Sequence, residues 1–552
     1  MNNPQIKNCQ NCKQEFKITE KELSMYQKVD VVIPDICFRC RVAQHFAFWQ
    51  FGKFRIGKSD LSGEQIITVY PDDVRFPIYT SKEWHSDAWD GLDSGQVYDE
   101  NRSFFEQMKE LQEKIPRPHQ EGTNNSNSDW ADDVWDSKNC YLSRSLKDCE
   151  DVFYTYRTLN CKKSIDLTFC FDLENSYDCT YCFKSYNIKY SIQSRDCFDS
   201  TFLYDCRNCS NCFMCWNLRG KSYCIENVQY SKEEYFEKLK NYDTTSRKSI
   251  FLLKGRFWEY VQTDVIHREN FNVRTNESTG DFLEEANNCK NCFSYSESEG
   301  MYNSVRGLRA KNTIDTNGCW YIENSGNCFG CVSSYDLKYS NWSAARYSEY
   351  LDICKDCEYC FGCIGLKKKK YCILNKQYTK EAYEILKTRI IDDMKKRGEY
   401  GHFFPYSMST IPYNLSTSSL YVPEKNKEDI LGLGGYWFDG ELSQINGSPS
   451  SEIPDTLENV DESICLKPFI CEKTGYRFNI AQNELAFYKQ YNIPLPDTHF
   501  DARTRDRLEL LISIELSRVK CFFCEKDILV SYKPEWNYKK IACEDCYKRE
   551  VL

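Results

Sequence analysis

The 552-residue sequence predicts a mainly β fold with short helices, in which terminal zinc ribbons flank a duplicated, cysteine-rich β-solenoid of the β-helix type. Three observations predict this fold. Paired C-x2-C motifs lie near both ends, the cysteines of the middle region recur at multiples of three residues, and a five-cysteine pattern is repeated 148 residues later. Short strands joined by tight corners explain a three-residue period, which neither a plain helix nor a plain strand produces.

Composition limits the class of protein before any motif is considered. The chain has 32 cysteines but only 6 histidines, so metal sites are expected to use mostly thiolate ligands. There are 72 basic and 82 acidic residues, which gives a net charge of −10. This balance argues against a general nucleic-acid coat or a binder of anionic membranes. The 41% hydrophobic content excludes wholesale disorder.

The start of the sequence predicts a cytoplasmic location. Residues 1–9 lack an apolar stretch, so no secretory signal is expected, and no run approaches the ~18 apolar residues of a membrane span. Cysteines in a reducing compartment either bind metal or pack as small apolar side chains. The alternative is an extracellular protein held together by disulfides.

The two ends of the chain each carry four cysteines with the spacing of a zinc ribbon. In the N-terminal set the two C-x2-C pairs are separated by 24 residues, and in the C-terminal set by 18. Four thiolates can surround one zinc ion tetrahedrally, and no histidine or carboxylate suggests an open coordination position. Two structural Zn²⁺ ions are therefore expected; the alternative is eight buried cysteines. The predicted ligands are Cys9, Cys12, Cys37, Cys40, Cys521, Cys524, Cys543 and Cys546.

A third ribbon-like segment precedes the C-terminal one. Residues 15–26 resemble residues 477–488 at a constant offset of 462, and on that offset Cys9 corresponds to Cys471. Cys37 corresponds to His499, however, and two further ligand positions hold Thr474 and Ala502. Residues 461–515 are therefore predicted to be a ribbon-derived module that has lost its metal, to which Cys465 could still add a ligand.

The middle of the chain follows a three-residue series. All twelve cysteines from Cys140 to Cys224 fall in one class modulo three, and none of the 27 series positions from 140 to 218 is charged. The residue before the series position is Asp or Asn in 15 of those 27 cases, and both favour turns and left-handed backbone. We expect the series to point into a narrow interior. The number of residues per turn stays open. The alternative interpretation of the series is ordinary globular packing in which the cysteine spacing is coincidental.

The solenoid is predicted to be duplicated. The cysteines from Cys206 to Cys224 recur from Cys354 to Cys372, and the second series shifts phase by one residue near Ala345. Each copy is followed by a predicted amphipathic helix with an N-cap residue, Ser231 or Thr379, which we expect to cover the solenoid end.

Four cysteines at three-residue spacing also suggest an iron–sulfur cluster or another metal. Cys206–Cys215 and Cys354–Cys363 differ from the ferredoxin pattern in the third gap, and no proline follows them. Because the series already explains the spacing, core packing is preferred, and metal binding stays an alternative.

The remaining segments complete the expected organisation. The aromatic stretch 46–55 is interpreted as a core that anchors the first ribbon, with base stacking as the alternative, and 119–129 as a linker. The predicted divisions are 1–118 for the N-terminal ribbon with its aromatic and helical extension, 119–242 for the first solenoid repeat with its capping helix, 243–282 for a connecting insertion, 283–400 for the second solenoid repeat with its capping helix, 401–460 for a linker, 461–515 for the degenerate module and 516–552 for the C-terminal zinc ribbon.

Five strings in the chain carry a resemblance to a known family. They are Ser86-Asp-Ala-Trp-Asp90, Phe104-Phe-Glu-Gln107, Ile115-Pro-Arg-Pro118, Tyr359-Cys-Phe-Gly-Cys363 with the segment 373–381, and Cys543-Glu-Asp-Cys-Tyr-Lys-Arg-Glu-Val551. Over nearly its whole length the chain resembles the cysteine-rich zinc-ribbon proteins of candidate-phyla bacteria, a family without known activity. Relatives tend to follow the first ribbon with an arginine-rich run, which Arg41-Val-Ala-Gln-His-Phe46 replaces here. That departure weakens a role in nucleic-acid binding.

The sequence favours a non-enzymatic zinc-binding scaffold or adaptor that presents its solenoid surface to a protein partner. A nucleic-acid- or ribosome-associated factor is the alternative, supported by the basic residues of segment 39–58. An iron–sulfur or redox protein that uses the cysteine runs is the third hypothesis. An enzyme is not expected, because no nucleophile–base pair, phosphate loop or open metal site is visible.

Overall fold

The chain forms two compact units that each contain one solenoid. The structure is a computed structural model and describes residues 4–51, 53–423, 425–439, 446–458 and 460–552. The first unit comprises Met1–Gln120, Asn270–Phe438 and Ser513–Ser517, and the second comprises Glu121–Glu269, Asp439–Ile512 and Arg518–Leu552. Each unit therefore combines segments that are distant in the sequence.

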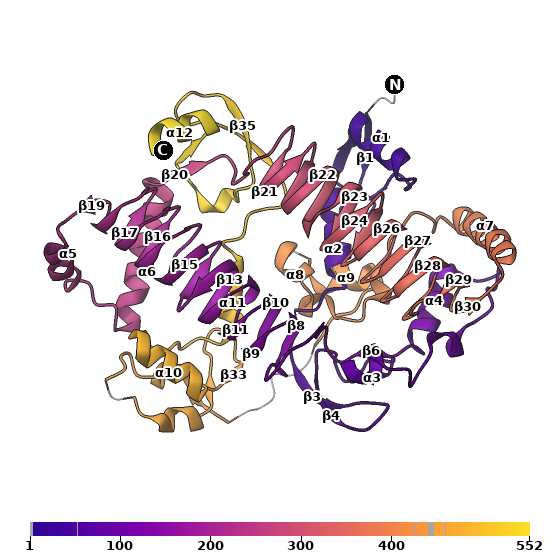
Figure 1. Ribbon diagram of the computed structural model, residues 1–552, viewed down its shortest axis with the longest axis horizontal. Helices are drawn as coiled ribbons and strands as arrows, with labels where there is room; N and C mark the ends of the chain where they lie inside the picture. The colour runs from indigo at the N-terminus through magenta and orange to yellow at the C-terminus, as the bar shows by residue number, and fades with distance from the viewer. Residues whose placement is uncertain (1–3, 52, 424, 440–445, 459) are drawn as a thin grey trace. The chain divides into compact units, whose positions relative to one another are not determined.

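The solenoid of the second unit has twelve residues per turn. Leu146 pairs with Thr158 and Thr158 pairs with Cys170, in parallel register on successive turns. This register supplies the turn length that the cysteine gaps left open. The stacked strands can be followed in Figure 1 and are β7 (Gly122–Thr123), β8 (Ala131–Trp135), β9 (Lys138–Tyr141), β10 (Ser143–Lys147), β11 (Glu150–Phe153), β12 (Tyr156–Leu159), β13 (Lys162–Glu174), β14 (Tyr177–Thr180), β15 (Phe183–Lys189), β16 (Phe198–Tyr204), β17 (Ser210–Trp216), β18 (Ser222–Ile225) and β19 (Val228–Gln229).

The solenoid of the first unit repeats this architecture but includes turns of eleven residues, one near its start, where Val273 pairs with Glu284, and one near Ala345. Met301 pairs with Thr313 twelve residues on, whereas Tyr335 pairs with Arg346 only eleven residues on. The irregularity at Ala344/Ala345 is the structural origin of the phase shift in the series. The strands are β21 (Gly280–Asn287), β22 (Lys290–Leu308), β23 (Lys311–Asn317), β24 (Cys319–Glu323), β25 (Gly326–Phe329), β26 (Val332–Lys338), β27 (Ala344–Glu349), β28 (Lys355–Phe361), β29 (Lys370–Ile373) and β30 (Lys376–Gln377).

Every third residue forms a left-handed corner. Asn139 has φ 53°, and Asp148 and Asp151 both have φ 54°, each one position before a series residue. Asn and Asp adopt this backbone at little cost, which is why they dominate the position. Their side chains also join successive turns, since the Asn139 amide donates to the Asp151 carboxylate at 2.7 Å.

The series residues fill the interior, as predicted. Cys149, Leu167, Leu203 and Leu351 are all buried, and each solenoid has a core built of such residues. Full burial of a leucine side chain contributes roughly 1.5–3 kcal/mol. The predicted inward direction of the series is therefore confirmed.

Serines of the series bond the backbone as well as filling space. The Ser143 hydroxyl donates to the Tyr141 carbonyl at 2.9 Å and accepts from the Thr155 amide of the next turn at 3.0 Å. A sharp corner turns some backbone groups inward, where they need partners. Small hydroxyl side chains supply them without widening the core.

Both solenoids end in an antiparallel hairpin and a helix. Strand β18 pairs antiparallel with β19, and β29 with β30. Helix α5 (Lys232–Leu239) places Tyr235 against Tyr223 with ring centroids 5.8 Å apart, and α7 (Lys380–Arg397) places Tyr383 against Tyr371 at the same distance. Ser231 and Thr379 are the N-caps, as predicted.

The first expected linker is wrong. Strand β7 pairs with β8, and Ser126 bridges to Lys138, so the 119–129 segment contains the first turn of its solenoid. Asn124 and Asn127 are left-handed corners in phase with the series, which accounts for the difference.

The segment 401–460 also differs from a free linker. Phe403, Tyr406, Met408 and Tyr413 are buried, and the segment contains short helices. Residues 424, 440–445 and 459 of that prediction lie outside the described part of the chain. The short elements of this segment are η2 (Tyr406–Met408), η3 (Tyr413–Leu415), α8 (Ser418–Tyr421), α9 (Lys427–Gly432), β31 (Ser448–Pro449) and η4 (Ser450–Glu452).

The aromatic stretch after the first ribbon is core, as predicted. Phe46, Phe48, Trp49 and Phe51 are buried in the first unit. Other elements of this unit are β3 (Arg55–Lys58), β4 (Gln65–Thr68), β5 (Ile78–Tyr79), α3 (Ser81–His85), η1 (Gly91–Ser94), α4 (Phe104–Gln112) and β6 (Arg117–Pro118). None of the helices in the described residues has the length and apolar content that crossing a membrane requires.

Candidate metal centres

The N-terminal ribbon positions its first two cysteines on a tight turn. Strands β1 (Gln5–Asn8) and β2 (Glu15–Ile18) form the antiparallel hairpin that carries this turn. The Cys9 amide donates to the Gln14 carbonyl at 2.8 Å, and the Lys13 amide donates to the Cys9 carbonyl at 2.9 Å. Lys13 is left-handed with φ 64° and closes the turn, so the Cys9 and Cys12 side chains lie on the same side.

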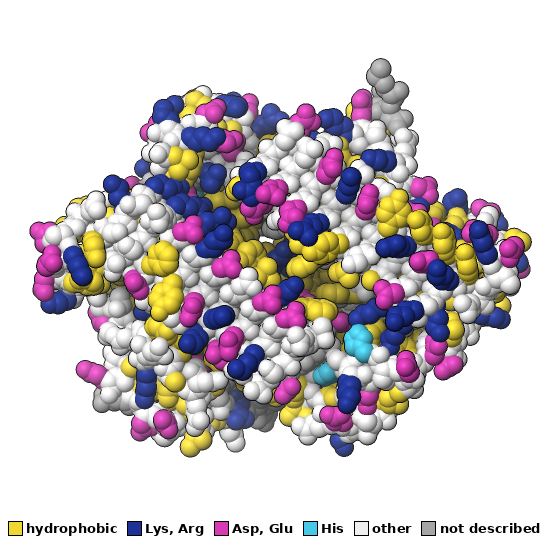
Figure 2. Space-filling view, in the orientation of Figure 1, with side chains coloured by type: hydrophobic (Ala, Val, Ile, Leu, Met, Phe, Trp, Pro, Cys, Tyr) yellow, Lys and Arg dark blue, Asp and Glu magenta, His cyan; other side chains and the backbone are white. Residues whose placement is uncertain are grey.

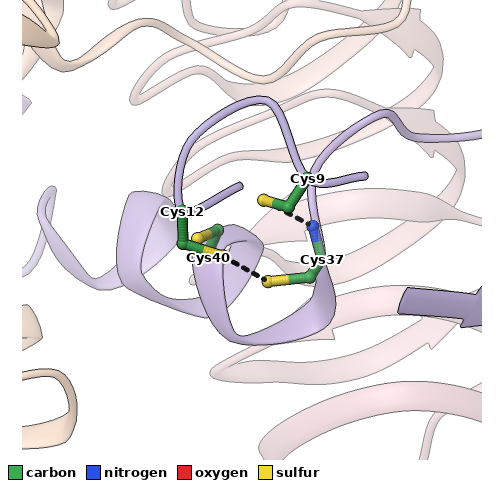
Figure 3. A group of neighbouring side chains, drawn as sticks. All are labelled: Cys9, Cys12, Cys37 and Cys40. Carbon is green, nitrogen blue, oxygen red and sulfur yellow. Dashed lines mark hydrogen bonds between the residues drawn. The ribbon is translucent and has the colours of Figure 1, made fainter. Parts of the chain in front are cut away.

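The second pair of cysteines comes from a helix start. Cys37 is the N-cap of α2 (Phe38–Phe46), and Cys40 lies in its first turn. The four Sγ atoms all lie within 4.8 Å of one another, and the Cys12 and Cys37 sulfurs are 3.7 Å apart (Figure 3). Tetrahedral coordination by thiolates with metal–sulfur bonds of about 2.3 Å needs sulfurs about this far apart. The residues therefore fit a metal ion.

Backbone donors favour the thiolate form at this centre. The Cys37 amide donates to the Cys9 sulfur at 3.2 Å (Figure 3). A hydrogen bond from the Cys40 thiol is the main cause that lowers the pKa of Cys37 to about 5. Burial raises the pKa of Cys12, so the Cys37 thiol is deprotonated before the Cys12 thiol. A cation would stabilise all four thiolates together.

The C-terminal centre has the same construction. Strands β34 (Ser517–Lys520) and β35 (Asp527–Val530) hold a turn in which the Cys521 amide donates to the Lys526 carbonyl at 2.9 Å and Glu525 has φ 60°. Cys543 is the N-cap of α12 (Glu544–Val551), and its sulfur is 3.7 Å from that of Cys524.

The C-terminal group also fits a metal ion. Its four sulfurs lie within 4.8 Å of one another, and the Cys543 amide donates to the Cys521 sulfur at 3.3 Å. Burial would raise the pKa of Cys521, but backbone amides including that of Cys543 outweigh it and hold the value at about 6. Across the described residues, these two groups are the ones with metal-binding geometry.

The module at 461–515 keeps the ribbon backbone. Strands β32 (Phe469–Ile470) and β33 (Arg477–Phe478) flank a turn in which the Cys471 amide donates to the Tyr476 carbonyl at 2.9 Å. Helices α10 (Gln482–Tyr491) and α11 (Phe500–Leu508) correspond at the offset of 462 to α1 (Glu20–Lys28) and α2. The two segments therefore place their helices at equivalent positions, as expected for a ribbon-derived module.

Aromatic packing replaces the ligand set in this module. His499 is the N-cap of α11, where Cys37 stands in the first ribbon, and its Nδ1 accepts from the Asp501 amide at 3.1 Å. The His499 ring contacts Phe500 at a centroid distance of 4.2 Å and Tyr476 at 5.4 Å. Cys465 does not join a metal-binding group in the described chain.

The two four-cysteine runs each occupy one turn of a solenoid. Cys206–Cys215 supplies all four inner positions of its turn, and Cys354–Cys363 does so in the other unit. The Cys209 thiol donates to the Arg207 carbonyl at 3.3 Å, and the Cys357 thiol donates to the Leu366 carbonyl at 3.4 Å. These contacts resemble those of the series serines. Neither run is among the metal-binding groups of the described residues.

The sequence did not reveal how the ribbons attach to the solenoids. In the first unit, Asp315 accepts from the Tyr26 hydroxyl at 2.6 Å and from Arg41 at 2.8 Å. In the second unit, Asp166 accepts from Arg503 at 2.8 Å. Arg503 is Arg41 moved by the ribbon offset of 462, and Asp315 is Asp166 moved by 149, the solenoid offset before the short turn. Comparison of the two offsets could have indicated this contact.

Two of the strings that carried the family resemblance, 86–90 and 115–118, make packing contacts in the first unit. Trp84 and Trp89 both lie over the Lys367 ammonium group at 4.5 Å from the ring centroids. Arg117 forms a buried ion pair with Asp352. These residues attach segment 84–118 to the last turns of the solenoid, so their pattern reflects folding.

Comparisons with known proteins add little to this geometry. No protein-family model matches the chain, and no curated protein matches it. Among solved structures, a candidate acetyltransferase from Desulfovibrio desulfuricans G20 is similar with a TM-score of 0.10 and 11% sequence identity, over 50% of this chain and 81% of that chain. A score this low carries no argument about fold or activity.

Proposed function

We propose that the protein is a non-enzymatic scaffold that is held together at its two ends by structural zinc and presents a solenoid surface to a protein partner. Membership of the cysteine-rich zinc-ribbon family of candidate-phyla bacteria belongs to the same proposal. The observation that carries it is a row of tyrosines on successive turns of the solenoid in the first unit.

Zinc is the metal that fits the two cysteine groups best. Both groups offer four sulfur donors and leave no position for water or substrate, as in structural zinc sites. Cys12 and Cys524 are exposed, so each group can receive an ion from solvent. A bound ion would fix the tight turn to the helix start that supplies the second cysteine pair.

The tyrosine row consists of Tyr335, Tyr347, Tyr359 and Tyr371 on successive turns. Their ring centroids are 5.6, 5.0 and 5.4 Å apart, and the last three rings are nearly parallel. Tyr347 is 39% exposed, and hydrophobic side chains line up across β26–β28 toward α7 in Figure 2. Tyrosine is enriched where proteins bind proteins, because it combines a large apolar area with a polar end.

The equivalent corner of the other solenoid shows that folding does not need Tyr347 and Tyr359, whereas Tyr371 has the counterpart Tyr223. At the offset of 148, Tyr347 corresponds to Asp199 and Tyr359 to Asn211. Both pairs have left-handed backbone, with φ of 46° to 54°. Bulky residues adopt this conformation at a cost of order 1 kcal/mol or more, which Asp and Asn largely avoid. The presence of tyrosine at positions 347 and 359 despite this cost favours a role of the two side chains in binding a partner.

Three arginines of segment 39–58 are paired with carboxylates, which favours a protein partner over nucleic acid. Arg41 is buried against Asp315, Arg39 pairs with Glu515 at 3.4 Å, and Arg55 pairs with Asp72 at 2.7 Å. Arginines that are already neutralised by carboxylates contribute little to binding phosphate.

Two buried histidines are engaged in packing, which supports a non-enzymatic role. His45 lies between Asn317 and Asn327, and burial lowers its pKa to about 3. His267 donates or accepts at the Tyr204 hydroxyl, and burial likewise lowers its pKa to about 3. Both imidazoles therefore stay neutral and enclosed at neutral pH.

Affinity capture from native lysate followed by mass spectrometry tests the proposal. We compare the full chain with a double variant, Tyr347→Asn and Tyr359→Asn, which should keep the corners and lose the rings. The Asn211→Asp variant on the other solenoid is the matched control. A protein captured by the parent and the control but not by the double variant is the expected result. Equal recovery of every captured protein by all three chains would contradict the proposed surface.

A further inference from the structure

A cavity of about 580 Å³ lies in the first unit between the N-terminal ribbon and its solenoid. Its lining includes Lys17, Lys21 and Lys290, together with Thr19 at the start of α1 and Tyr302 of β22. A volume of this size is in the range of small-molecule sites, about 300–1,000 Å³.

The three lysines are available to an anionic ligand. None of them forms an ion pair with a carboxylate among the residues that the structure describes, and the Lys290 ammonium group donates only to the Glu277 carbonyl. Two acids also line the cavity. Glu20 is exposed, whereas both oxygens of Glu22 are already bonded, one by Asn303 and the other by Thr19. The cavity therefore keeps an excess of one positive charge.

Tyr302 places a hydrogen-bond donor at the cavity. Its side chain is only 5% exposed and lines the cavity. Within the described chain its hydroxyl has no hydrogen-bond partner, and burial raises its pKa, so the group stays a neutral donor. Because the hydroxyl is not among the enclosed side-chain atoms that lack a partner, it reaches solvent and can donate to a ligand in the cavity.

The second unit shows the same interface without the cavity chemistry. At the ribbon offset of 462, Lys17 and Lys21 correspond to Asn479 and Asn483. At the solenoid offset of 149, Lys290 corresponds to Tyr141, and Tyr302 to Phe153.

Aromatic rings occupy this region of the second unit. Tyr141 contacts Phe153 at a centroid distance of 6.2 Å and Tyr154 at 6.0 Å. Docking of a ribbon on a solenoid thus needs neither the lysines nor the tyrosine hydroxyl, which are particular to the first unit.

We propose that this cavity binds a small organic phosphate, such as a nucleoside diphosphate. Lysine ammonium groups are common partners of phosphate, and the hydroxyl of Tyr302 adds a neutral donor to the lining. The binding site is separate from the proposed scaffold surface, because the tyrosine row belongs to other turns of the solenoid. Ligand binding would join the ribbon to the solenoid through β2, α1 and β22 and stabilise the first unit.

Isothermal titration of the purified full chain with ADP, inorganic phosphate and adenosine tests the proposal. ADP is expected to bind, inorganic phosphate to bind more weakly, and adenosine not to bind. The variants Lys290→Tyr and Tyr302→Phe install the residues of the second unit, so their folding is supported by a natural precedent. We expect Lys290→Tyr to weaken ADP binding at least about tenfold. Tyr302→Phe should weaken it several-fold.

The Lys311→Ala variant is the matched control, because it removes an exposed lysine of the same solenoid outside the cavity. It should bind ADP as the parent does. Absence of heat with both ADP and inorganic phosphate would overturn the proposal, and so would ADP binding that Lys290→Tyr and Tyr302→Phe leave unchanged. Circular dichroism of each variant verifies that an altered titration does not reflect unfolding.

Discussion

Asp315 accepts hydrogen bonds from both Arg41 and Tyr26, and so it joins the solenoid of the first unit to two helices of the N-terminal ribbon. Its counterpart Asp166 binds Arg503 and Arg507 in the second unit. Both aspartates are left-handed corner residues, with φ of 55° and 60°. Corner aspartates stabilise the solenoid turn, and Asp315 and Asp166 also bind the ribbon or ribbon-like module that is packed against their solenoid.

We expect Asp315→Asn to destabilise the first unit by about 3–5 kcal/mol, because the buried Arg41 would lose its counter-ion. The measurement is the free energy of unfolding in urea. Asp148→Asn is the control, since Asp148 is an exposed corner with nearly the same φ of 54°. Equal stability of the two variants would show that the ion pair does not hold the ribbon.

Metal removal should act first on the ends of the chain. Purified reduced protein is expected to contain close to two zinc ions, and Cys12→Ser and Cys524→Ser should each remove one of them. Elemental analysis by plasma mass spectrometry measures the change. Cys465→Ser is the control and should leave the content unchanged, because Cys465 lies outside both groups. Protein without zinc, purified without chelator, would contradict this prediction.

Leu203→Lys should cost several kcal/mol, because it places an unpaired charge in the interior of the solenoid, where Leu203 is fully buried. Thermal unfolding followed by circular dichroism measures the loss. Thr201→Lys on the same strand is the control, because Thr201 lies outside the three-residue series and is only half-buried, and it should cost less. Identical melting of the Leu203→Lys variant and the parent would be incompatible with an inward series.

The four-cysteine turns should hold no metal. Cys209→Ser and Cys357→Ser are expected to leave the metal content unchanged, because a serine hydroxyl can donate to the same backbone carbonyls as the thiol does. The purified protein should also lack the broad absorbance near 400 nm that iron–sulfur clusters show. A brown anaerobic preparation, or the loss of one metal per chain in either variant, would establish a metal site there.

The stability of the first turns in the second unit should fall as the pH rises from about 4 to 6. Burial raises the pKa of Asp133 to about 6, above the value of about 3.9 expected for the unfolded chain. The folded state then binds more protons in this window, so ionisation costs stability that is fully lost above pH 6.

Asp133→Asn should therefore stabilise the protein at pH 7 by roughly 2 kcal/mol and reduce the pH dependence. Asparagine suits the left-handed corner and can keep hydrogen bonds with Trp135 and Ser145. Urea unfolding at pH 4.5 and pH 7 measures both effects. A variant whose stability changes with pH as steeply as that of the parent would rule out Asp133 as the source, and leave Asp132 as the group to test.

Much of the solenoid could be predicted from the sequence because its backbone repeats a local rule. A left-handed corner every third residue needs Asp or Asn, and a narrow interior needs small or apolar side chains, so both leave a periodic trace. The rule reaches back to Gly122 and Asn125, but their setting between polar residues suggested a linker. The turn length could not be predicted, since any multiple of three satisfies the corners and only strand pairing selects twelve.

The cysteine groups could be predicted because zinc-binding turns are encoded within a few residues. The ribbon contacts could not, because Arg41 and Asp315 are 274 residues apart and neither lies in a motif. The fate of the third ribbon was intermediate: the loss of ligands was visible in Thr474 and Ala502, whereas the aromatic contacts of His499 depend on packing. Sites encoded within a few neighbouring residues can thus be predicted from the sequence, whereas contacts between residues that are distant in the sequence are much harder to predict.

The eleven-residue turn at Ala344/Ala345 has a consequence for how such a chain can change over time. A deletion of one residue would move every later side chain of an ordinary strand to the opposite face. Here the register recovers within one turn, since Ala345 pairs with Cys357 at the normal separation of twelve. Each turn contacts mainly its neighbours, so the disturbance does not spread. Single-codon losses, and gains of whole turns, are therefore tolerated in this architecture, and its length is free to evolve while the modules at its ends keep their own sites.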